Sequence, residues 1–91
     1  MSPELLKALA NALSNYRQAI ARASDPEAKE DYSTLAAITD KIIAAIQAGD
    51  VAQVKLGVLG FSRQVSDAYS TQPPEYKVLS EKISEVKKLV A

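Results

Sequence analysis

The chain has 91 residues, 47% of them hydrophobic, and its 11 lysine and arginine residues balance its 11 aspartate and glutamate residues. This length allows one domain, 1–91, and the hydrophobic fraction is far above that of disordered chains. Interspersed charges without a basic excess argue against nucleic-acid binding, and the absence of cysteine and histidine removes the commonest transition-metal ligands and general base.

The first half of the chain predicts two helices, over residues 3–23 and 26–48. Ser2 and Asp25 each precede a proline, which is a typical helix start with a capping side chain and proline in the first turn. Gly49 supplies the left-handed residue that ends the second helix. The apolar stripes of these helices are Leu5, Leu9, Leu13, Tyr16 and Ile20, and then Ala28, Tyr32, Leu35, Ile38, Ile42 and Ile46.

The second half predicts two further helices, over residues 51–70 and 74–90. Asp50 is the cap of the third helix, and the pair Pro73-Pro74 prevents that helix from continuing. Their apolar stripes are Val51, Val54, Val58, Phe61, Val65 and Ala68, and then Tyr76, Leu79, Ile83, Val86 and Val90.

The predicted fold class is all-α, since no segment shows the period-two alternation of a strand. The connections between the helices are only about two to four residues long, and short connections force neighbouring helices to run antiparallel. We therefore expect a four-helix antiparallel bundle with up-down-up-down topology.

Several apolar residues lie outside these stripes. Leu56 and Leu59, with Ala52 near them on the helical wheel, fall on the side of the third helix opposite Val54. Ile43 is displaced in a similar way on the second helix. Either these two helices are central and touch more neighbours than a regular bundle allows, or the residues form an exposed strip for homodimerisation or partner binding.

Gly57 and Gly60 are unexpected in the middle of a helix, because each costs about 1 kcal/mol of helix stability relative to alanine. One interpretation is a close approach of the backbone to a neighbouring helix. The other is a shallow groove or bend that admits a partner.

The tyrosines gather at one end of the expected bundle, and the arginines lie in the same half. The residues are Tyr16, Tyr32, Tyr69 and Tyr76, with Arg17, Arg22 and Arg63. Tyrosine and arginine are enriched at binding hot spots. The simpler interpretation is that the rings close the end of the bundle while their hydroxyl groups reach water.

The motifs of enzymes and metal proteins are missing. There is no Gly-x-Ser-x-Gly elbow and no glycine-rich phosphate loop. The cluster Asp25, Glu27, Glu30 and Asp31 suits the positive end of a helix better than a cation. Uncharged stretches are much shorter than the about 20 residues of a membrane-spanning helix. We expect a cytoplasmic protein that is not an enzyme, has no cofactor or metal, and binds neither nucleic acid nor membranes.

The functional hypothesis is a non-enzymatic protein-interaction module, such as a small adaptor, a chaperone-like protein or an assembly component. It binds a protein partner or itself, as a homodimer formed through the second and third helices. The candidate residues for that contact are Leu56, Leu59, Ala52, Ile43, Gly57 and Gly60. The alternative is a bundle that binds a small ligand or peptide at its Tyr/Arg-rich end, through Tyr16, Arg17, Tyr32, Arg63, Tyr69 and Tyr76.

Overall fold

The computed structural model describes residues 2–67 and 72–90, and these residues form four α-helices and no strand. The helices are α1 (Pro3–Arg22), α2 (Pro26–Ala48), α3 (Val51–Asp67) and α4 (Glu75–Val90). The all-α prediction is confirmed, and the starts and ends of α1, α2 and α4 agree with the predicted ranges to within one residue. The last predicted turn of the third helix, residues 68–70, lies outside the described residues.

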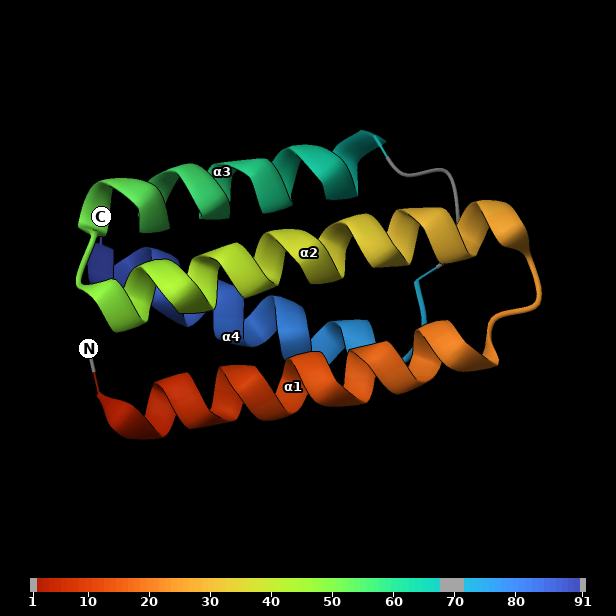
Figure 1. The fold of residues 1–91 in the computed structure, drawn as a ribbon, viewed down its shortest axis with the longest axis horizontal. Helices are drawn as coiled ribbons and strands as arrows, with labels where there is room; N and C mark the ends of the chain where they lie inside the picture. Colours follow the sequence, from red (N-terminus) through yellow and green to blue (C-terminus); the bar gives the residue numbers. More distant parts are fainter. Residues whose placement is uncertain (1, 68–71, 91) are drawn as a thin grey trace.

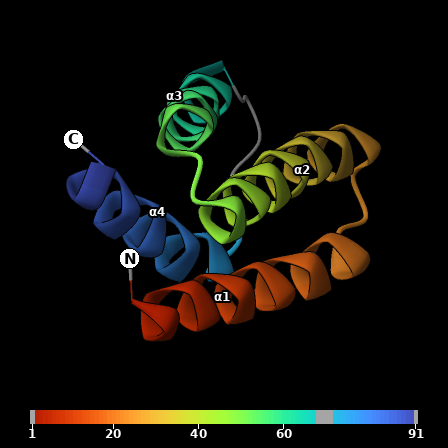
Figure 2. The same cartoon turned by 60° about the vertical axis from the view of Figure 1, so that its left-hand side comes forward.

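The helices lie side by side, and successive helices run in opposite directions (Figure 1). The start of α1 and the end of α4 therefore lie at the same end of the bundle. Each helix packs on its neighbours in the chain, and α1 also packs on α4, so that the four helices form a ring (Figure 2). The ring is uneven, because α3 packs extensively on α2 but only sparsely on α4.

The caps that the sequence predicts are present at the helix ends. The Ser2 hydroxyl accepts a hydrogen bond from the backbone N–H of Leu5, and the Asp25 carboxylate accepts one from the N–H of Glu27. Gly49 ends α2 with a φ of 70°, in the left-handed region that favours glycine. These local signals fix the short connections and hence the antiparallel order of the helices.

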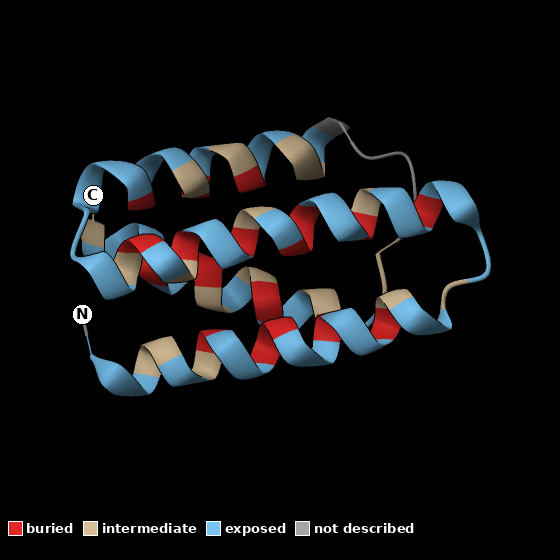
Figure 3. Cartoon of the chain, viewed as in Figure 1, coloured by how far each residue is buried: buried red, intermediate tan, exposed pale blue. Residues whose placement is uncertain are grey.

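The core runs along the axis between the helices, where the buried face of each helix points inward (Figure 3). The largest fully buried side chains are Leu9, Tyr16, Leu35, Ile42, Leu79 and Val86, with Thr39 among them. The Thr39 hydroxyl donates a hydrogen bond of 2.9 Å to the Leu35 carbonyl, so this buried polar group has a partner. One stripe residue, Val51, is exposed, because it lies in the first turn of α3 at the end of the bundle.

The close packing of α3 on α2 depends on Gly57. A Cβ atom at this position would lie 2.5 Å from Cγ1 of Ile42, so the backbone of α3 lies against a side chain of α2. The interpretation of Gly57 as a site of close helix approach is confirmed. Gly60 differs, since a Cβ atom there would meet nothing within 4 Å.

Candidate functional site

The outer face of α3 carries a strip of exposed apolar side chains. Leu56 is 60% exposed and Leu59 is 47% exposed. Ala52, one turn earlier, is also exposed. The spacings of four and three residues between Ala52, Leu56 and Leu59 place all three on one side of the helix. We call these three residues the outer strip.

The apolar excess on α2 has a different cause. Ala36 is buried, and Ile43 is half-buried and packs against the core. The additional apolar residues of α2 thus contact neighbouring helices, whereas those of α3 form an exposed strip. Ile43 therefore lies apart from the outer strip.

A shallow hollow lies between α2 and α3, beside the outer strip. It has a volume of about 240 Å³, and its lining residues are Ile38, Lys41, Gln53, Leu56, Gly57 and Gly60. Gly60 has no side chain, and a Cβ atom there would meet nothing within 4 Å, so no side chain closes the hollow at this point. The groove interpretation fits Gly60 better than a close helix approach does.

Aromatic rings fill the end of the bundle where α1 ends and α2 begins. The rings of Tyr16 and Tyr32 meet edge to face with centroids 5.8 Å apart, and both residues are buried. Phe61 and Tyr76 stack with centroids 6.3 Å apart. These are favourable packing geometries for aromatic pairs. Tyr69, the remaining candidate of this group, lies outside the described residues.

The hydroxyl group of Tyr16 donates a hydrogen bond of 2.8 Å to Oε1 of Gln72. Burial raises the pKa of Tyr16 above its usual value, and the neighbouring Tyr32, Tyr76 and Asp31 add to this effect. Within the described residues, Nε2 of Gln72 is buried without a hydrogen-bond partner.

The arginines of this half are exposed. Arg17 pairs with Asp40 of α2, and Arg22 pairs with Glu75 of α4 at 2.5 Å. The hydrogen bond from Arg22 lowers the pKa of the Glu75 carboxyl group. Arg63 is exposed on α3. Tyr16, Tyr32 and Tyr76 are thus engaged in packing and two of the arginines in ion pairs, while ligand binding at this end stays a prediction.

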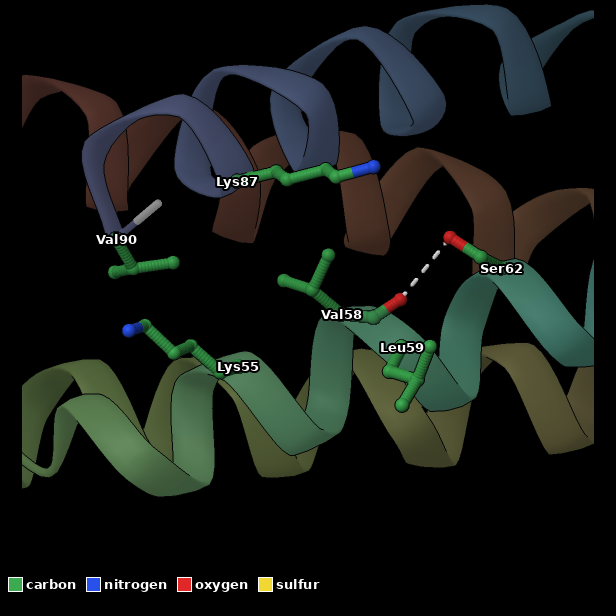
Figure 4. A pocket seen from close by; sticks show the side chains of 6 residues that line it. All are labelled: Lys55, Val58, Leu59, Ser62, Lys87 and Val90. Atoms are coloured by element: carbon green, nitrogen blue, oxygen red, sulfur yellow. Dashed lines mark hydrogen bonds between the residues drawn. The ribbon is translucent and has the colours of Figure 1, made fainter.

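A larger hollow, which the sequence did not predict, lies between α3 and α4. It has a volume of about 420 Å³ and is lined by Lys55, Val58, Leu59, Ser62, Lys87 and Val90 (Figure 4). A second hollow of about 230 Å³ shares three of these residues and continues toward the aromatic end, where it is lined also by Phe61, Val65, Tyr76, Ser80, Ile83 and Ser84. We call the two together the α3–α4 groove.

The groove results from the sparse packing of α3 on α4. One sequence signal could have indicated it. Ser62 lies beside the apolar stripe of α3, and Ser80 and Ser84 lie beside that of α4. Side chains this small do not fill the space between two helices, so a run of them beside facing stripes favours an open seam.

Across residues 2–67 and 72–90, no three aspartate or glutamate side chains come together as ligands for a metal ion. None of the helices in this part of the chain has the length and apolar character needed to cross a membrane.

Comparisons with protein-family models, with curated proteins and with solved structures gave no match to this chain.

Proposed function

We propose that the chain is a non-enzymatic, cytoplasmic protein-interaction module that self-associates through the outer face of α3. It acts as a small adaptor, a chaperone-like protein or an assembly component. The observation that carries this proposal is the exposure of Leu56 and Leu59 on one side of the same helix. A net charge of zero does little to oppose association between copies.

The geometry favours a two-fold contact in which α3 of one protomer packs on α3 of its partner. Such an interface uses the same patch on both copies, as most homodimers do. Ala52 and Gly60 flank the two leucines and have little or no side chain, so two helices can approach closely there. The hollow beside Gly60 offers space for a leucine from the partner.

The expected dimer is weak. Full burial of a leucine contributes about 2 kcal/mol, and about half of each side chain is still exposed, so four leucines give about 4 kcal/mol. A helix of 17 residues is about 25 Å long and presents a narrow contact. The loss of translational and rotational freedom opposes this gain, while the remaining contacts along α3 add to it. A net gain of about 4 kcal/mol corresponds to a dissociation constant of about 1 mM, which is the value we expect.

The test is sedimentation equilibrium over a wide concentration range, with Leu56→Asp as the variant and Leu89→Asp as its matched control. Leu89 is 59% exposed, almost the same as Leu56, but lies on α4 away from the outer strip. We expect the wild type and Leu89→Asp to dimerise and Leu56→Asp to remain monomeric. A wild type that stays monomeric at about 1 mM, or equal dimerisation of both variants, refutes the proposal.

The alternative proposal, a ligand or peptide at the Tyr/Arg-rich end, has weaker support. Tyr16 is already packed against Tyr32 and hydrogen-bonded to Gln72. A ligand would have to displace these contacts before it could use the ring.

A further inference from the structure

The α3–α4 groove combines an apolar floor with a positive rim. Val58 lies at its centre. The side chains of Lys55 from α3 and Lys87 from α4 lie along opposite walls of the hollow, with their ammonium groups toward opposite ends (Figure 4). We propose that this groove binds an amphipathic helix with acidic flanks, supplied by a second protein. The inference deepens the interaction role proposed above by naming a partner class, but it does not require self-association.

The shape of the groove favours a helix over a small molecule. On α3 it extends from Lys55 to Val65, about 15 Å, and on α4 from Tyr76 to Val90, about 21 Å. A partner helix of about 10 to 14 residues spans this length at a rise of 1.5 Å per residue. A small ligand needs a site that encloses about 70–90% of its surface, whereas this groove is open along one side and Leu59 at its edge is 47% exposed.

The charges select the chemistry of the partner. No residue that lines either hollow is acidic. Within the described part of the chain, neither Lys55 nor Lys87 forms an ion pair. Carboxylates on both flanks of a bound helix would supply the missing partners, while its apolar stripe would cover Val58 and Val90. Such a helix-in-groove arrangement is a recurring mode of peptide recognition.

The helices of the same chain are poor candidates for the occupant, since each of them already buries its own apolar stripe in the bundle. Two lysines over an apolar floor also differ from a nucleic-acid site, which requires several phosphate contacts. The favoured occupant is therefore a helix from another protein.

The test uses two designed, fluorescently labelled peptides of about 14 residues. Both carry leucines spaced four, three and four residues apart, and they differ only in having glutamates or lysines on the flanks. Fluorescence anisotropy measures affinity, and NMR shift perturbation locates the contact. We expect saturable binding of the acidic peptide and no binding of the basic peptide. The affinity for the acidic peptide should fall at least about tenfold when the salt concentration is raised to about 1 M.

Charge reversal is the decisive variant. The double variant Lys55→Glu/Lys87→Glu should bind the acidic peptide at least about tenfold more weakly than the wild type and should gain binding of the basic peptide. Lys88→Glu is the matched control, because Lys88 is the next residue of the same helix but does not line the groove. Gain of basic-peptide binding also shows that the reversed variant is folded.

The proposal is overturned if the acidic peptide shows no saturable binding at about 1 mM, or if both peptides bind equally. It is also overturned if a fatty acid binds at the groove and the acidic peptide does not. Concentration-dependent shifts at Val58 and Lys87 in the absence of peptide would overturn it as well, because they would identify a second copy as the occupant. The variant Leu56→Asp separates the two proposals. If it is monomeric and still binds the acidic peptide, the groove stands independently of the outer strip.

Discussion

Replacement of Gly57 by alanine tests the close approach of α3 to α2. Alanine normally stabilises a helix by about 1 kcal/mol relative to glycine. Here the added Cβ atom would lie 2.5 Å from Cγ1 of Ile42, and 3.7 Å from its Cα atom. Ile42 is fully buried and β-branched, so its side chain cannot rotate away without a clash elsewhere.

The expected magnitude follows from these two opposing effects. Overpacking of a core by one methyl group costs about 1–3 kcal/mol. Gly57→Ala should therefore lower the free energy of unfolding by about 0–2 kcal/mol despite its better helix propensity. The matched control is Gly60→Ala on the same helix, where no atom lies within 4 Å of the new Cβ. This variant should raise the free energy of unfolding by up to about 1 kcal/mol.

Urea denaturation followed by circular dichroism measures both variants. The two free energies of unfolding should differ by about 1–3 kcal/mol, with Gly60→Ala the more stable. A double-mutant cycle with Ile42→Ala adds a second test, because removal of Cγ1 should abolish the penalty of Gly57→Ala. If Gly57→Ala is as stable as Gly60→Ala, the helices are farther apart at this point than the structure shows and the reasoning fails.

Two further changes address the aromatic end and the α2–α3 turn. Tyr16→Phe removes the hydroxyl that donates to Gln72 and should lower the free energy of unfolding by about 1 kcal/mol in urea denaturation. Burial raises the pKa of Tyr16 in the folded chain, so the folded state favours the neutral hydroxyl. The resulting contribution to the free energy of unfolding is complete below the usual tyrosine pKa of about 10 and is lost as pH rises above that value. The wild type should therefore lose more stability between about pH 9 and pH 12 than Tyr16→Phe, and equal losses would contradict the burial effect. Gly49→Ala places a side chain at a φ of 70° and should cost about 1 kcal/mol, measured as a lower melting temperature, whereas Gly49→Asn should cost less.

Much of the fold follows from local sequence signals. The caps at Ser2 and Asp25 and the glycine at position 49 fix helix ends, because each satisfies backbone groups that a helix leaves unpaired. The exposure of Leu56 follows from periodicity as well. Once Val54 and Val58 face the core, a residue two positions away lies on the far side of the helix.

Other features depend on how far apart the helices lie, which periodicity does not specify. Ile43 and Leu56 are both displaced from their stripes, yet Ile43 packs against the core and Leu56 does not. The difference arises because α2 has close neighbours in both α1 and α3, whereas α3 has a close neighbour only in α2. The α3–α4 groove was not predicted for the same reason.

The two glycines of α3 connect these observations. Gly57 lets α3 lie directly on Ile42 of α2, and a helix drawn toward one neighbour leaves more space toward the other. The groove on the α4 side is the expected consequence, and small serines beside the stripes leave it unfilled. A Cβ atom at Gly60 would meet nothing within 4 Å, so no close approach of another helix offsets the cost of this glycine in helix stability. Contact with a second molecule at the α2–α3 hollow, as proposed for the outer strip, would offset that cost.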